Sequence, residues 1–299
     1  MSSFHSILCP VDFSEHSAQA LRLAAGLAAQ QRARLTVLTV ADPLLVEAAA
    51  AAHYGGHFVE EESRRELERF VVSTVTSKAR WTRPADLVVA TGPPQDEILD
   101  CARRLSSDLI VMGTHGVGGY RKMLFGSVTE RVLRHSTVPV MATPLRAEEI
   151  VTLSGEAPTF RISTVLAPVD FGPGTERQVR MAAALAADFG ALLLFVHVVP
   201  ELRALTRLTE AVASQAQTRL ERIRSELTAL ASRTPAVKSD FHATLGAPAN
   251  EIARVAVERH AGLIVMGLTG HGAATGRPGS VAYRVLGETP VPVLAIPPG

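Results

Sequence analysis

The residues best suited to chemistry in this 299-residue chain lie in a glycine-rich loop that follows an apolar run, Leu109 to Met112. Glycine lets the backbone approach a ligand closely because it carries no side chain. Successive N–H groups that lead into a helix N-terminus attract an anion, and the helix dipole adds to that attraction. Arg121 and Lys122 bring positive charge to the same loop. The pattern predicts a phosphate-binding loop built on Gly113, Gly116, Gly118, Gly119 and Gly126.

A carboxylate near the start of the chain is predicted to face this loop. Asp12 directly follows the first apolar run, and Val40 ends the second. Ligands of open α/β sheets bind beyond the carboxyl ends of the strands, at the point where the strand order reverses. If the first and fourth strands are neighbours there, Asp12 and Gly113 border one crevice, and Val40 lies beside it.

The elements that must position these residues occur twice, because the chain contains two copies of one unit. ILCPVDF at residues 7–13 returns as VLAPVDF at 165–171, an offset of 158 (165 − 7). LIVMG at 109–113 returns at 263–267, an offset of 154 (263 − 109). A shared order with a slowly drifting offset indicates duplication with small insertions and deletions. The second copy therefore repeats the main site positions as Asp170, Val198 and Gly267.

Each copy alternates apolar, strand-like runs with helical patterns, which favours βα units on a parallel sheet. The strands of the first copy are predicted near residues 6–11, 34–40, 85–90, 108–112 and 138–142. Those of the second are predicted near 162–169, 191–198, 238–244, 262–266 and 291–296. Helices are predicted over 14–30, 93–105 and most of 44–80 in the first copy, and over 201–233 in the second.

The predicted fold class is α/β, with two tandem doubly wound (Rossmann-like) domains, each a five-stranded parallel sheet flanked by helices. We expect the first domain at residues 1–146, a linker at 147–160 and the second domain at 161–299. Val138-Pro139-Val140 and Val291-Pro292-Val293 place a proline inside the last strand of each copy, which suits an edge strand. Exposed edges invite pairing, so these strands are predicted to mediate a homodimer or a pairing of the two domains.

The sequence resembles the universal stress protein family in its tandem two-domain form, over almost the whole chain. ILCPVDFSEHS, LIVMGTHG and STVPVMATP carry the resemblance. The most specific feature is the glycine pattern of the ATP-binding branch, which Gly113, Gly116, Gly126 and Ser127 match in spacing. The resemblance implies that ATP is held by Asp12 and the backbone near Val40 on the nucleoside side, with the glycine loop around the phosphates. A divalent cation, Mg²⁺ or Mn²⁺, would accompany it.

The chemistry of these groups agrees with that division. A carboxylate accepts hydrogen bonds from ribose hydroxyls, whereas backbone N–H groups and a serine hydroxyl suit phosphate oxygens. The predicted binding residues of the first copy are Pro10, Val11, Asp12, Val40, Met112, Gly113, Thr114, His115, Gly116, Gly126, Ser127 and Val128. Those of the second copy are Pro168, Val169, Asp170, Val198, Gly267, Gly270, Gly279, Ser280 and Val281.

The second copy departs from the glycine pattern, and whether it binds nucleotide is left open. Eight residues separate Gly270 from Gly279, whereas nine separate the matching glycines of the first copy. Pro278 also removes one backbone donor beside Gly279. In the first copy, Ser127 has a second predicted role, because Ser-Val-Thr-Glu at 127–130 fits a capping box with Glu130. Asp12 could likewise serve only as a helix cap.

Composition and missing motifs limit the function classes. Apolar residues make up 47% and charged residues 20%, with a net charge of +1, which favours a globular cytoplasmic protein without nucleic-acid or membrane partners. Two cysteines are too few for a disulfide framework or a zinc site. No GxxxxGK[ST] loop is present, and no catalytic residue or metal ligand is assigned. A nucleotide-dependent stress-response regulator is favoured. A slow ATPase or other ATP-using enzyme and a nucleotide-free dimerisation scaffold remain as alternatives.

Overall fold

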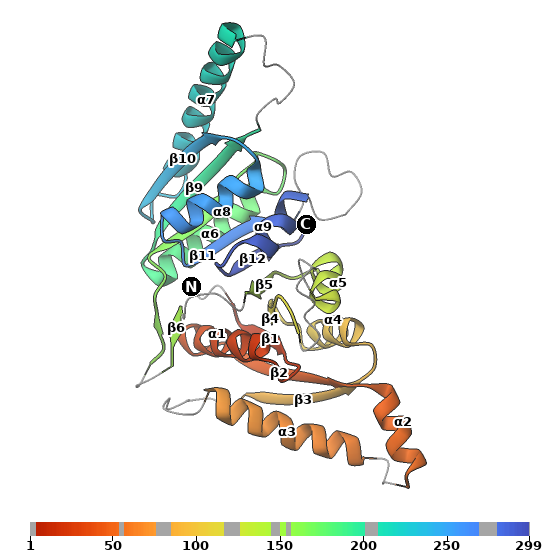
Figure 1. Ribbon diagram of the computed structural model, residues 1–299. Helices are drawn as coiled ribbons and strands as arrows, with labels where there is room; N and C mark the ends of the chain where they lie inside the picture. Colours follow the sequence, from red (N-terminus) through yellow and green to blue (C-terminus); the bar gives the residue numbers. More distant parts are fainter. Residues whose placement is uncertain are drawn as a thin grey trace. The chain divides into compact units, whose positions relative to one another are not determined.

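The protein is described by a computed structural model that covers residues 4–53, 57–75, 85–116, 126–144, 150–153, 157–200, 209–268 and 280–298. The chain divides into two compact units, Met1–Arg161 and Ile162–Gly299, which are described separately. Strands and helices alternate along each unit (Figure 1), so the predicted α/β class is confirmed. Among the described residues, no helix combines the length and apolar character needed to cross a bilayer.

The first unit is built on a parallel sheet with strand order β5-β4-β1-β2-β3. Helix α1 packs beside α3, and α4 packs beside α5. Right-handed crossovers place these two pairs on opposite faces of the sheet, as a doubly wound fold requires. The strands are β1 (Ser6–Pro10), β2 (Arg34–Ala41), β3 (Asp86–Thr91), β4 (Leu109–Gly113) and β5 (Val140–Thr143). The helices are α1 (Glu15–Gln31), α2 (Pro43–Ala51), α3 (Phe58–Val75), α4 (Pro94–Arg104) and α5 (Ser127–His135).

The second unit repeats this topology, with strand order β12-β11-β8-β9-β10. Its long helix α7 is described from Thr209, so residues 201–208 of the predicted helix lie outside the described part of the chain. The strands are β8 (Thr164–Pro168), β9 (Leu192–Val199), β10 (Ser239–Leu245), β11 (Leu263–Gly267) and β12 (Val293–Ile296). The helices are α6 (Thr175–Phe189), α7 (Thr209–Ser232), α8 (Pro248–Glu258) and α9 (Ser280–Glu288).

The central strands of the first unit are buried along their whole length because helices cover both faces of its sheet. All five residues of β1 and all five of β4 are buried. Short, continuously apolar strands are typical of parallel sheets with two covered faces. Burial of these strands therefore holds the sheet in place, and with it the residues at its carboxyl edge, such as Asp12 after β1 and Gly113 at the end of β4.

The two last strands begin directly after their prolines, so the prediction of a proline inside the strand is wrong by one residue. Strand β5 starts at Val140 and β12 at Val293. The proline carbonyls still accept the first bond of the ladder, from Ile110 N–H at 3.0 Å to Pro139 in the first unit. A proline can accept but not donate in a ladder, which suits this position. Association through these strands stays a prediction.

Part of the segment between the two sequence repeats forms a small antiparallel hairpin, β6 (Val151–Thr152) and β7 (Thr159–Phe160). The hairpin packs on α1 at Gly26. A Cβ atom at Gly26 would lie 2.5 Å from Val151 Cγ2 and 3.0 Å from the Phe160 ring. Glycine is therefore required at this point of α1 by close packing, and the hairpin belongs to the first unit.

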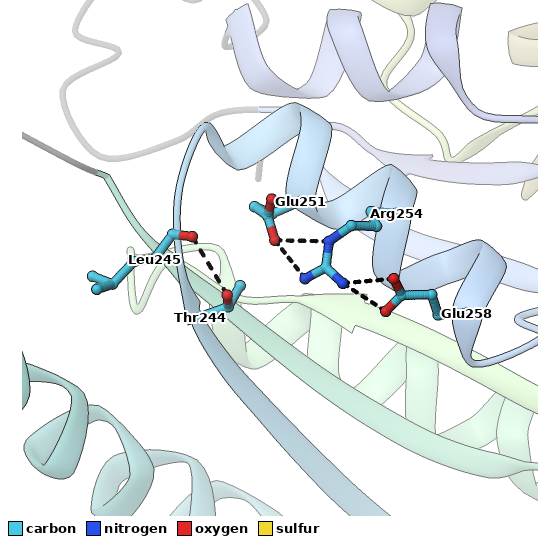
Figure 2. Close-up of polar contacts among 5 residues, drawn as sticks. All are labelled: Thr244, Leu245, Glu251, Arg254 and Glu258. Carbon is cyan, nitrogen blue, oxygen red and sulfur yellow. Dashed lines mark hydrogen bonds and ion pairs between the residues drawn. The ribbon is translucent and has the colours of Figure 1, made fainter. Parts of the chain in front are cut away.

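The turn from the third strand into the next helix is the same in both units. Gly92 and Gly246 have φ of +155° and +147°, which L side chains rarely adopt. A glutamate on the following helix covers each glycine, and in the second unit this is Glu251. Figure 2 shows Arg254 of α8 reaching both Glu251 and Glu258, with nitrogen–oxygen distances of 2.6 Å. These exposed ion pairs orient Glu251 and add little to stability.

Candidate functional site

The strand order brings the two halves of the predicted crevice together in the first unit. Strand β1 pairs with β2 on one side and with β4 on the other, so the strand order reverses between β1 and β4. Asp12 follows β1, and Gly113 is the last residue of β4. The predicted adjacency of these two strand ends is confirmed.

The Asp12 carboxylate lies against the backbone of Gly116. A Cβ atom at Gly116 would stand 2.4 Å from Asp12 Oδ2, a distance that real Cβ atoms essentially never show. The other oxygen, Oδ1, accepts hydrogen bonds from the Ser14 hydroxyl at 2.6 Å and the Ser14 N–H at 3.2 Å. Only glycine therefore lets the loop come this close to the carboxylate, which itself is exposed.

The turn that holds Asp12 uses a left-handed residue. Phe13 has φ of 62°, which lets the chain reverse so that Ser14 donates back to Asp12. The Phe13 ring meets Phe70 of α3 edge-on, with centroids 5.5 Å apart. Ser14 then caps α1 by accepting from Ser17 N–H at 3.2 Å. Asp12 orients the turn and leaves the capping bond to Ser14.

Threonine hydroxyls fix the end of β4. Thr129 Oγ1 donates to the Gly113 carbonyl at 2.9 Å, and Thr143 Oγ1 donates to the Met112 carbonyl at 3.1 Å. Thr114 N–H bonds the Thr143 carbonyl at 3.0 Å, and all three threonines are buried. Buried, satisfied hydroxyls hold the backbone in one geometry. The loop therefore departs from a rigid point.

The far end of the loop returns to the same place. Gly126 N–H bonds the Thr114 carbonyl at 2.9 Å, and a Cβ on Gly126 would lie 3.7 Å from Gly116 N. Residues 117–125, which include Gly118, Gly119, Arg121 and Lys122, lie outside the described part of the chain.

Helix α5 starts one residue earlier than the capping box requires. Gly126 is the N-cap, and its carbonyl accepts from Glu130 N–H at 3.0 Å. The Glu130 carboxylate pairs with Arg134 at 2.5 Å, so the predicted reciprocal box between Ser127 and Glu130 is wrong. Ser127 is exposed at the first helical position. The N–H groups of the first turn have no intrahelical acceptor, so they and the Ser127 hydroxyl can face a ligand.

The remaining predicted residues of the first unit line the strand ends. Pro10, Val11 and Met112 are buried, whereas Val40 is half-buried on β2. Val11 N–H bonds the Leu38 carbonyl at 2.8 Å, which holds the turn after β1 against β2, two residues before Val40. His115 and Gly116 are half-buried, as is Val128. Val40 therefore borders the crevice on the side opposite the glycine loop.

The second unit keeps the carboxylate side of this arrangement. Asp170 Oδ1 accepts from Gly172 N–H at 2.9 Å, as Asp12 accepts from Ser14. Phe171 is left-handed at φ 58°, like Phe13. Pro168 and Gly267 are half-buried, Val169 and Val198 are buried, and Val281 is half-buried on α9. The backbone of Ser280 opens α9, whereas Gly270 and Gly279 lie outside the described residues.

The second unit lacks the hydroxyls that fix the loop of the first. The offset between the copies is 154 before the glycine loop (263 − 109) and 153 after it (279 − 126). By these offsets, Thr114 corresponds to Leu268, Thr129 to Ala282 and Thr143 to Ile296. All three replacements are apolar and buried. The end of β11 is therefore held by apolar packing, without the two hydroxyl-to-carbonyl bonds of β4. These threonines are missed by motif reasoning, although comparison of the two copies position by position identifies them.

Burial controls the ionisation of several groups. Burial lowers the pKa of His16 at the start of α1, and the neighbouring His115 lowers it further. Burial raises the pKa of both thiols, Cys9 and Cys101. Within the described ranges, no cluster of three or more metal-ligating side chains occurs. The first-unit crevice therefore offers the exposed Asp12 carboxylate, the His16 imidazole, a helix N-terminus and glycine backbone, a set that suits binding of a sugar hydroxyl and an anion.

The family model described as the universal stress protein family matches residues 3–144 and 161–297. Universal stress protein YxiE of Bacillus subtilis is 32% identical over 144 residues, which is 46% of this chain and 97% of that protein. A universal stress protein of Mycolicibacterium smegmatis is 25% identical and spans 98% of this chain and 97% of its own length. The crystal structure of a universal stress protein from Archaeoglobus fulgidus matches all of both chains, with a TM-score of 0.66 and 23% identity.

Proposed function

The chain belongs to the universal stress protein family, and we propose that its first unit binds ATP as the switch of a nucleotide-dependent stress-response regulator. The observation that carries the proposal is the approach of the Asp12 carboxylate to the backbone of Gly116. It joins a hydrogen-bond acceptor for ribose hydroxyls to a glycine loop that opens a helix. A nucleotide carries both matching groups, the ribose hydroxyls and the phosphates.

Each group of the crevice has one part in this binding. Asp12 accepts from the ribose hydroxyls, and the backbone at Val40 meets the base. The first-turn N–H groups of α5 and the Ser127 hydroxyl bind phosphate oxygens. A divalent cation, Mg²⁺ or Mn²⁺, would arrive with the phosphates as their counterion. A nucleotide bound here would connect the turn after β1 with the first turn of α5. The surface formed by these bound segments would then differ from that of the free protein, and partners would recognise that difference.

We propose that the second unit binds nucleotide more weakly than the first. Its aspartate turn is kept, but the threonine hydroxyls that fix β4 are replaced by apolar side chains. Its glycine loop is also one residue shorter. A loop without fixed ends loses more conformational entropy when it closes on a ligand.

Matched aspartate variants test the proposal. Nucleotide released from the purified full chain is identified by mass spectrometry, and ATP binding is measured by calorimetry for wild type, Asp12→Asn and Asp170→Asn. Asparagine keeps the acceptor for the turn but loses the charge. Loss of a charge-assisted bond costs about 1.5–3 kcal/mol, so Asp12→Asn weakens binding at least roughly tenfold. Asp170→Asn changes it less than about threefold.

Three outcomes decide between the functions. No released nucleotide and no ATP affinity in the millimolar range favour the dimerisation scaffold and overturn the proposal. Rapid, saturable phosphate release with magnesium favours the enzyme. Equal losses in the two aspartate variants contradict the ranking of the units.

A further inference from the structure

Two imidazoles flank the end of β4 at the point where the glycine loop begins. His16 lies in the first turn of α1, so close that a Cβ atom on Gly113 would stand 2.9 Å from His16 Cβ. His115 lies two residues beyond Gly113. The two rings face each other with centroids 5.4 Å apart and planes tilted by 46°. Sequence reasoning assigned no role to His16.

The His16 ring has an unsatisfied polar atom at this position. Its Nδ1 is buried and makes no hydrogen bond within the described part of the chain. A buried nitrogen without a partner costs free energy, so such an atom in a native fold calls for an explanation. A ligand oxygen in the crevice would supply the missing partner once the imidazole ring turns this nitrogen toward it.

Burial and the neighbouring charges together lower the pKa of His16 in the free protein. Burial is the largest effect and lowers the pKa of His16, and His115 acts in the same direction. Asp12 and Glu15 of α1 act in the opposite direction but do not prevail. The facing strands β4 and β5 carry no ionisable side chain in their sequences, LIVMG and VMAT.

We propose that His16 and His115 form a proton-linked clamp for the phosphate groups of the nucleotide, in which binding brings a proton onto the pair. The inference deepens the proposed function and rests on it. An anion within about 4–6 Å favours the imidazolium form, and an imidazolium donates from both ring nitrogens. The negative charge of the phosphates thus favours the imidazolium that then donates hydrogen bonds to them. Without the phosphates, burial disfavours this charge.

The direction of the pH dependence follows from linkage. Bound phosphate raises the pKa of His16 above its value in the free protein. The gain in affinity is therefore complete below the free pKa and is lost as the pH rises through the bound pKa. Within that window, the dissociation constant rises up to tenfold per pH unit for each proton taken up.

The second unit has no such clamp, because Gly174 occupies the position of His16 by the offset of 158. A Cβ placed on Gly174 would meet no heavy atom within 4 Å among the residues that the structure describes. Proton-linked binding is therefore expected in the first unit alone. The pH dependence of the affinity then distinguishes binding in the first unit from any binding in the second.

Calorimetry of the full chain with ATP, from pH 6 to 8 and in buffers of different ionisation heat, measures the protons taken up. Wild type, His16→Gln and His115→Gln are compared, and His57→Gln is the control because the His57 side chain is 88% exposed. We expect the wild-type dissociation constant to rise roughly threefold per pH unit more than that of His16→Gln. His57→Gln keeps the wild-type profile. Protonation of ATP itself is common to all four proteins and cancels.

The outcomes separate the clamp from the binding function. ATP binding with the same proton uptake in wild type and His16→Gln overturns the clamp alone. No ATP binding by wild type at any pH overturns the proposed function and the clamp with it. If His16→Gln does not fold, the titration of His16 Cε1–H in wild type is followed by NMR with and without ATP. A pKa that rises with ATP supports the clamp, and an unchanged pKa overturns it.

Discussion

Replacing Gly116 with alanine tests whether the crevice depends on the approach of Asp12 to the glycine loop. The added Cβ would stand 2.4 Å from Asp12 Oδ2, so the carboxylate must retreat by at least about 0.6 Å to reach the 3.0 Å limit of real contacts. That rotation breaks the bonds from Ser14 to Oδ1, at 2.6 and 3.2 Å. The carboxylate then no longer lies where the ribose hydroxyls are expected.

The expected loss is that of a charge-assisted hydrogen bond, about 1.5–3 kcal/mol, which is about 10- to 100-fold in ATP affinity. Stability should change by less than about 1 kcal/mol, because Asp12 is exposed and water replaces its lost partners. Gly116 is absent from the positive-φ residues, so alanine adds no backbone strain. Gly113→Ala would be a poorer test, since its Cβ would stand 3.1 Å from the His16 backbone and would strain the fold.

Gly126→Ala is the matched control in the same motif. Among the described residues its Cβ would meet only ordinary contacts at 3.6–3.7 Å, and its φ of −66° suits alanine. Calorimetry with ATP and thermal unfolding are measured for wild type and both variants. We expect Gly126→Ala to change affinity by less than about threefold, a figure that allows for the weaker N-cap. A loss in Gly126→Ala equal to or larger than that in Gly116→Ala would refute the reasoning.

Further predictions concern packing, thiol chemistry and acid stability. Gly26→Ala pushes the β6–β7 hairpin from α1 and destabilises the first unit by about 1–3 kcal/mol in urea, whereas Gly26→Ala with Val151→Ala recovers part of the loss. Cys9 and Cys101 stay unmodified by a thiol reagent at pH 7.5 until urea is added, because burial raises both pKa values. Burial lowers the pKa of His242, so the unfolded chain binds more protons as pH falls from 7 to 5. The folded state then loses stability, and His242→Gln flattens that pH dependence.

The strands were predictable because their signal lies in the residues themselves. Short continuous apolar runs such as LIVMG favour strands buried on both faces, and they recur in both copies. The observed bounds of β4, Leu109–Gly113, differ by one residue from the predicted 108–112. The position of Asp12 beside the glycine loop was predicted on the condition that the first and fourth strands are neighbours, and the pairing of β1 with β4 meets that condition.

What could not be predicted depends on contacts between distant residues. The N-cap of α5, Gly126, is held by a hydrogen bond from its N–H to the Thr114 carbonyl, and no local sequence pattern predicts that bond. The β6–β7 strands have only two residues each, too short for a periodic signal, and they exist through packing on Gly26. The His16–His115 pair is likewise invisible in sequence, since 99 positions (115 − 16) separate its members.

The meeting of Asp12 with Gly116 also constrains when the site can exist during synthesis. The two residues are 104 positions apart (116 − 12), and the glycine loop reaches Asp12 because β4 pairs with β1. The chain must therefore close a loop of about a hundred residues before any crevice is present. The entropic cost of this closure comes before the favourable contacts that the closed chain makes. A nucleotide cannot assist the early steps. It can only favour the finished unit by mass action, so ligand should slow the unfolding of this unit and leave its initial collapse unchanged.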